Sequence, residues 1–190
     1  AYTIRTLHLE KYIGSVLVDR GDRISWTGDA YVSQGTVYAF ASNYNAVRQN
    51  LNITACPNCC NGIATYCLYF VLSVCEYFRE TGDLETFELY LSIVEAKLEV
   101  AQQTFANPSG LRFVGWDDRT GSGFANNTTP ETQNLYRMLA IRAWTEFADA
   151  LTSAKLRPDL VNHYRNYSKT AVDVSNRRLC SSVRSQSQQA

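Results

Sequence analysis

The sequence predicts an all-α fold built from antiparallel helical hairpins. Residues 63–80 are apolar on nearly every side, which is typical of a helix that is buried among other helices. Residues 84–105 place their apolar side chains on one stripe and most of their charges away from it, which is typical of an outer helix. Thr81-Gly82-Asp83 between them ends one helix and starts the next. The two segments therefore predict an inner helix followed by an outer one.

Four further elements are expected before this hairpin. Residues 2–10 indicate a short helix, and the apolar, partly β-branched residues 12–18 indicate a short extended segment. A helix should run from Gly28 or Asp29 to about 43, because an acidic residue in the first turn complements the positive end of a helix. Residues 51–62 are expected to form a loop.

Five segments follow the hairpin. We expect a short strand over 111–116 and a loop rich in Gly, Asn and Thr over 117–129. A helix over about 130–151 opens on a proline, which is favoured in the first helical turn. Another helix opens at Arg157-Pro158 and reaches about 176. The Ser- and Gln-rich residues 177–190 are expected to be disordered, so the domain is predicted to span 1–176.

The most informative segment is residues 19–29. It holds three carboxylates, two guanidiniums and one indole, without the apolar periodicity of a core helix or strand. Such a loop suits a site for a polar ligand, because an indole stacks on a sugar ring and carboxylates accept hydrogen bonds from hydroxyl groups. Two alternatives stay open: a solvated turn whose charges pair with each other, and a role for Asp29 as a helix cap.

The residues Asp22-Arg-Ile-Ser-Trp26-Thr-Gly-Asp29 resemble the Glu-Arg-Leu-Gly-Trp-Thr-Gly-Asp segment of α-L-rhamnosidases, glycoside hydrolase family 78. The resemblance implies the (α/α)6 toroid of the six-hairpin glycosidases. It also implies that Asp22 is the general acid, where the family has Glu, and that Trp26 and Asp29 line the sugar subsite. Asp19 replaces an upstream Asp of the family if the loop is shorter here, and Arg23 is a further candidate for substrate binding.

A second candidate loop is Gly115-Trp116-Asp117-Asp118-Arg119. Family members carry a Gly-Asp-Trp-like element in this region, so the resemblance implies that Trp116, Asp117 and Asp118 bind substrate. A surface turn is the alternative interpretation.

Composition limits the partners. Lys plus Arg and Asp plus Glu both number 18, which argues against nucleic acid and anionic membranes. No apolar run is long enough to span a bilayer. Four glycosylation sequons and six cysteines favour a secreted protein, with a signal sequence outside the given residues. We expect no metal and no cofactor, and a disulfide from the Cys56–Cys60 loop, with Cys67 or Cys75 as possible partners. The oligomeric state is not predicted.

The resemblance therefore implies a glycoside hydrolase that hydrolyses terminal α-L-rhamnosides or related sugars with inversion. About six helices make three hairpins, so we expect about half a toroid, inactive alone, with the second catalytic carboxylate beyond residue 190. A non-catalytic carbohydrate-binding domain, favoured by Asp22 in place of Glu, and a structural all-α domain are the alternatives.

Overall fold

A computed structural model describes residues 26–40, 44–55, 63–106, 114–117, 123–126 and 130–187. Within these ranges it is helical, apart from one short β-hairpin. The helices are α2 (Thr27–Phe40), α3 (Asn45–Thr54), α4 (Ala64–Thr81), α5 (Leu84–Ala106), α6 (Pro130–Ala154) and α7 (Pro158–Ser187). The strands are β1 (Val114–Asp117) and β2 (Gly123–Asn126), which pair antiparallel. The all-α class is confirmed.

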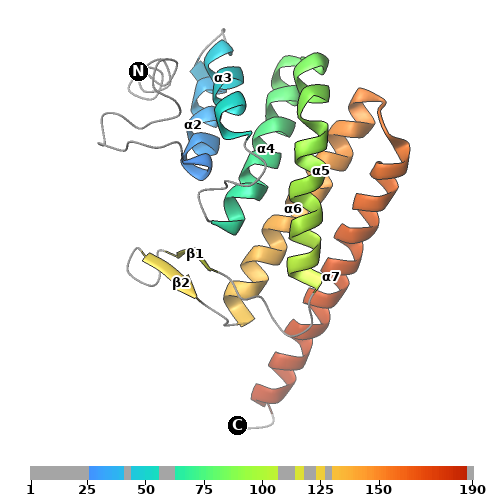
Figure 1. The fold of residues 1–190 in the computed structure, drawn as a ribbon. Coiled ribbons are helices and arrows are strands. Elements are labelled where there is room, and N and C mark those ends of the chain that lie inside the picture. Colours follow the sequence, from blue (N-terminus) through green and yellow to red (C-terminus); the bar gives the residue numbers. More distant parts are fainter. Residues whose placement is uncertain are drawn as a thin grey trace.

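The helices form three successive pairs, and α4 is the central element. It contacts α2 on one side and α6 on the other, with α3 and α5 also packed against it. Each pair consists of an inner helix (α2, α4 or α6) followed by an outer one (α3, α5 or α7), and the three pairs lie side by side in Figure 1. As expected, the helix around Tyr69 is more buried than the helix around Glu95.

One hydrophobic core joins the pairs. Among the described residues, its three largest fully buried side chains are Phe70 of α4, Phe87 of α5 and Phe147 of α6. Phe87 of α5 stacks on Phe78 of α4 with ring centroids 4.6 Å apart and lies 6.2 Å from Phe147 of α6. On α7, Tyr164 packs against Phe147 at 5.3 Å. Each aromatic residue therefore connects neighbouring helices.

The connection between α4 and α5 has the predicted chemistry. Gly82 adopts a left-handed conformation with φ 68°, and its N–H donates to the Phe78 carbonyl at 2.8 Å. The Asp83 carboxylate then accepts the Thr86 N–H at 3.0 Å, which caps the start of α5. The bend between α6 and α7 instead uses Lys155 and Arg157 at positive φ.

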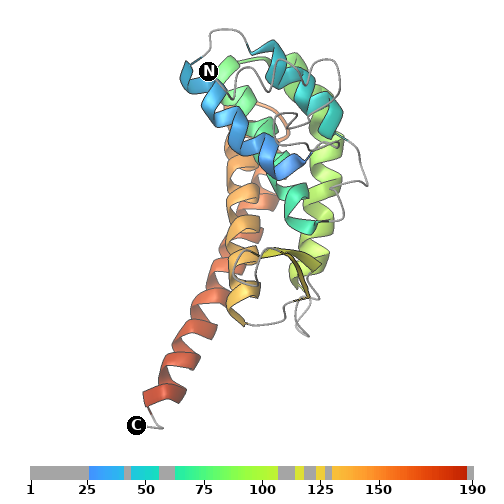
Figure 2. The ribbon, with the colours of Figure 1, turned by 90° about the vertical axis from the view of Figure 1, so that its left-hand side faces the viewer.

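All three inner helices begin at the same end of the molecule. Figures 1 and 2 show that the β-hairpin lies at this end, close to the starts of α4 and α6, and β1 contacts α4. Within the described ranges, no helix combines the length and the apolar character needed to span a membrane.

Three expectations need correction. Residues 51–54 belong to α3 and not to a loop, because Val47 and Leu51 are spaced by one turn and both are buried. Residues 123–126 of the expected 117–129 loop form β2. The helix expected to end near 176 continues to Ser187, where we expected disorder. The helix expected over 2–10 and the extended segment over 12–18 lie outside the described residues.

Candidate functional site

The start of α2 is shaped by its close approach to α4 at Gly28. The Trp26 carbonyl accepts the Ala30 N–H at 2.9 Å and so begins the helix. Gly28 is buried, and a Cβ atom there would lie 2.6 Å from Cε1 of Tyr66. Only glycine allows this approach without moving the ring. The Trp26 and Asp29 side chains, on either side of Gly28, are thereby held next to Tyr66.

An aromatic group, made up of Trp26, Tyr31, Tyr66 and Tyr69, spans α2 and α4. Trp26 meets Tyr66 edge to face, with ring centroids 6.3 Å apart. Tyr66 packs against Tyr69 at 6.1 Å, and Tyr69 stacks on Tyr31 at 5.5 Å. All four rings are partly buried, so each is fixed by packing yet still reaches solvent.

Asp29 adds a carboxylate to the aromatic group. The Tyr66 hydroxyl donates to Asp29 Oδ2 at 3.4 Å, which is a long hydrogen bond. Asp29 also lies in the first turn of α2, where an acidic residue is favourable. Partly exposed aromatic rings beside a hydrogen-bond acceptor suit a neutral ligand with several hydroxyl groups, such as a sugar.

Arg142 brings the third inner helix to the same surface. Its guanidinium lies 6.0 Å from the centre of the Tyr31 ring and donates to the Tyr31 hydroxyl at 2.9 Å. Burial raises the pKa of Tyr31, and the Arg142 charge opposes this shift. The phenol therefore stays neutral at physiological pH.

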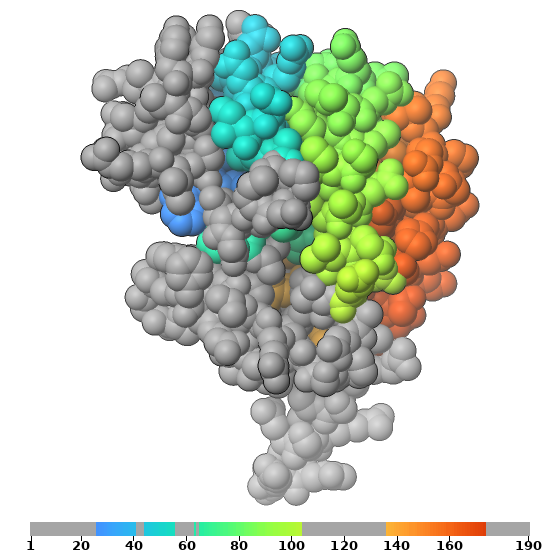
Figure 3. Space-filling view, viewed as in Figure 1, coloured from blue at the N-terminus to red at the C-terminus, as the bar shows by residue number. Residues whose placement is uncertain are grey.

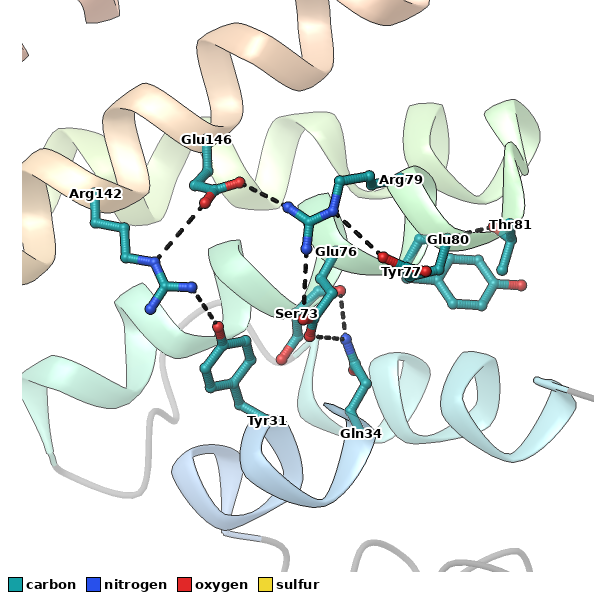
Figure 4. A network of polar contacts seen from close by, with 10 residues as sticks. All are labelled: Tyr31, Gln34, Ser73, Glu76, Tyr77, Arg79, Glu80, Thr81, Arg142 and Glu146. Carbon is teal, nitrogen blue, oxygen red and sulfur yellow. Dashed lines mark hydrogen bonds and ion pairs between the residues drawn. The ribbon is translucent and has the colours of Figure 1, made fainter. Parts of the chain in front are cut away.

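An ion-pair network continues along the same three helices, as Figure 4 shows. Arg79 of α4 pairs with Glu146 of α6 at 3.0 Å, and Arg142 approaches the other oxygen of Glu146 at 3.8 Å. Arg79 also lies 3.5 Å from Glu76. Because these arginines are about half exposed, each ion pair contributes modestly, on the order of 0–1 kcal/mol.

The buried end of this network is Gln34. This residue is only 1% exposed, and its Nε2 donates to the Ser73 carbonyl at 2.9 Å and to Glu76 at 3.3 Å. Burial raises the pKa of the Glu76 carboxyl, whereas Arg79 and the Gln34 amide lower it. Gln34 therefore ties α2 to α4 by two polar contacts inside the helix interface.

The structure brings together only part of the predicted site. Trp26 and Asp29 meet through Tyr66, as described above. Trp116 and Asp117 belong to β1, whose backbone lies at the end where the inner helices begin, but their side chains are outside the described part of the chain. Four other predicted residues also fall outside it: Asp19, Asp22, Arg23 and Asp118.

Sequence reasoning did not identify Tyr66, Tyr69 or Arg142 as site residues. We assigned both tyrosines to the apolar surface of a buried helix, yet their spacing of three residues already placed them on one face. Arg142 and Glu146 are spaced by one helical turn in an otherwise mostly apolar part of α6, and this pair of charges was the available signal.

The cysteine pattern is partly resolved. Cys67, near the start of α4, is disulfide-bonded. Cys75, two turns later, is a buried free thiol whose pKa is raised by burial. Of the two possible partners for the loop cysteines, the structure thus leaves Cys75 unpaired.

Comparison with known proteins adds no relative: no family model matches the sequence, and neither the curated proteins nor the solved structures contain a match.

Proposed function

We propose that the chain forms part of a glycoside hydrolase of the α-L-rhamnosidase type and contributes three hairpins of an (α/α)6 toroid. The alternation of inner and outer helices supports this architecture, because each inner helix packs against a neighbouring inner helix and against its own outer partner. The β-hairpin, whose strand β1 contains Trp116 and Asp117, lies at the end where the inner helices begin, which supports a shared site.

The observation that carries the proposal is the contact of Trp26 and Asp29 with Tyr66. These residues come from two neighbouring inner helices and form one surface with aromatic rings and a carboxylate. A sugar ring would stack on Trp26, and its hydroxyl groups would donate to Asp29. The Tyr66 hydroxyl, held by Asp29, would orient that carboxylate.

The chemistry that we propose is inverting hydrolysis. Asp22, four residues before Trp26, would protonate the leaving oxygen. A second carboxylate on the other face of the sugar would activate water, across a gap of about 6.5–9.5 Å. The disulfide at Cys67 is consistent with an oxidising compartment, as proposed for a secreted protein.

The test separates binding from turnover in the whole protein. Trp26→Ala should weaken binding of an aryl α-L-rhamnoside by about twofold to tenfold, the range expected for one aromatic contact. Phe40→Ala removes an aromatic ring from the same helix, and because that ring is 76% exposed this variant serves as the matched control. Asp22→Asn should abolish hydrolysis but keep binding, because the amide has the same shape and no transferable proton.

Three outcomes distinguish the candidates. Rhamnoside hydrolysis that is lost in Asp22→Asn, but not in the Asp149→Asn control, supports the enzyme. Sugar binding that depends on Trp26 without any turnover supports a carbohydrate-binding domain, which the shorter acid at position 22 favours. Equal sugar binding by Trp26→Ala and the Phe40→Ala control would contradict both.

A further inference from the structure

A second polar groove lies in the outer layer, between α3 and α5. Its volume is about 470 Å³, and both helices contribute polar side chains to its walls. Figure 3 shows α3 and α5 next to each other on one face of the molecule. The aromatic group instead lies between the inner helices α2 and α4. The groove is therefore a different site from the proposed sugar site.

Tyr90 of α5 provides the buried side of the groove. The residue is only 4% exposed, and its ring packs edge to face on Phe70 at 5.9 Å. Among the described residues its hydroxyl has no hydrogen-bond partner, although the side chain lines the groove. The hydroxyl oxygen is not among the fully buried unpartnered atoms of these residues, so it faces the groove, where water or a ligand can accept its hydrogen bond.

Arg48 of α3 supplies a positive charge to the same groove. Its charge acts on Tyr90, since it lowers the Tyr90 pKa that burial raises. In the described part of the chain Arg48 forms no ion pair. The nearby Asp83 carboxylate is already occupied by the Thr86 N–H at 3.0 Å, the Thr86 hydroxyl at 2.6 Å and the Tyr77 hydroxyl at 3.0 Å. The Arg48 charge contributes to the lowered pKa of Asp83, but no ion pair joins the two in the described part of the chain, so the guanidinium can still donate hydrogen bonds to an anion.

The other polar side chains that line the groove indicate which functional groups the anionic ligand should have. Gln49 and Asn52 line the α3 wall with amides, which both donate and accept hydrogen bonds. Glu85 lines the α5 wall with a carboxylate, which accepts hydrogen bonds from hydroxyl groups and repels a second negative charge. One cation facing one anion disfavours a phosphate dianion and favours a single carboxylate joined to hydroxyl groups.

We propose that this groove binds a small sugar acid, with its carboxylate on the Arg48 guanidinium and the Tyr90 hydroxyl, and its hydroxyl groups on Asn52 and Glu85. Leu89 supplies an apolar contact for the ring carbons. The ligand and the site both differ from those of the proposed hydrolysis, so the groove can bind a sugar acid whether or not the protein hydrolyses rhamnosides.

The probe is sodium glucuronate, titrated into the protein by calorimetry at low ionic strength and neutral pH, with glucose and sodium phosphate as comparison ligands. Glucuronate should bind at least about tenfold more tightly than glucose, because a charge-assisted hydrogen bond to an arginine distinguishes them. Arg48→Gln should remove that difference. Tyr90→Phe, which keeps the ring packed on Phe70, should weaken glucuronate binding by about twofold to tenfold.

Arg165→Gln is the control, because Arg165 is an exposed arginine on α7 that pairs with Asp149 at 3.1 Å, outside the groove. It should bind glucuronate as the unchanged protein does. The proposal is overturned if glucuronate and glucose bind equally, if phosphate binds more tightly, or if none binds in the millimolar range. It is also overturned if Arg48→Gln, still folded by circular dichroism, keeps the preference for glucuronate.

Discussion

Replacing Gly28 by alanine tests whether the close approach of α2 to α4 organises the proposed sugar site. The added Cβ would lie 2.6 Å from Cε1, 2.9 Å from Cζ and 3.1 Å from Cδ1 of Tyr66. The first two distances are too short for carbon atoms in contact. The Tyr66 ring must therefore move, which breaks its hydrogen bond to Asp29 and its edge contact with Trp26.

The size of the effect follows from two opposing terms. Overpacking of this kind costs about 1–3 kcal/mol. Alanine in place of glycine stabilises the protein by about 0.4–1 kcal/mol, because it restricts the conformations of the unfolded chain. We therefore expect Gly28→Ala to lower the free energy of unfolding by up to about 2.6 kcal/mol. Gly35→Ala, in the same helix with nothing within 4 Å of the added Cβ, should instead raise it by about 0.4–1 kcal/mol.

Urea denaturation of the two variants and the unchanged protein measures this difference, and near-ultraviolet circular dichroism reports the movement of Tyr66 and Trp26. We expect Gly28→Ala to unfold at lower urea than Gly35→Ala and to alter the aromatic spectrum. If the two variants were equally stable and had the same aromatic spectrum, the close approach would not exist and the site built on it would be wrong.

Two further predictions concern the pH dependence of stability. Burial raises the pKa of Glu76 above its ordinary value of 4.5, so the native state keeps the Glu76 proton to a higher pH than the unfolded chain does. The free energy of unfolding should therefore fall as the pH rises from the ordinary pKa through the raised pKa of the native state. Glu76→Gln should flatten this part of a thermal-unfolding profile, and an unchanged slope would contradict the assignment. The hydrogen bonds from Thr86 lower the pKa of Asp83, so its contribution should be present at neutral pH and disappear in acid, below the ordinary value of 3.8. Asp83→Ala should cost about 0.5–2 kcal/mol at neutral pH and little at acidic pH; an equal loss at both would rule out capping by the ionised carboxylate.

The elements that sequence predicted well have strong local signals. The central hairpin was placed to within about one residue at its ends, because residues 64–81 are mostly apolar, residues 84–106 are amphipathic and Gly82 separates them. In contrast, α3 was missed. Its only strongly buried apolar side chains, Val47 and Leu51, are surrounded by asparagine, glutamine and threonine, so the periodic signal was too weak.

In the candidate site, too, residues close together in the sequence could be predicted, whereas partners far apart in the sequence could not. Trp26 and Asp29 lie within one short motif, so sequence alone could propose both as site residues. Tyr66 is 37 residues from Asp29, and only the packing of α2 on α4 places them together. Arg142 is 111 residues from Tyr31, and no local pattern links the two. Long-range partners of this kind depend on helix crossing positions, which residue periodicity does not determine.

The bond between Gln34 and the Ser73 carbonyl has a consequence for how accurately α2 is aligned along α4. A buried amide that slides past its acceptor loses a hydrogen bond inside an apolar interface, whereas apolar side chains can shift with less loss. A helix is stiff, and eight residues separate Trp26 from Gln34, or about 12 Å along the axis. Any slip at Gln34 would therefore carry Trp26 past Tyr66 by the same distance. The buried Gln34 amide thus fixes the position of the Trp26 indole along the axis of α2, relative to Tyr66 on α4.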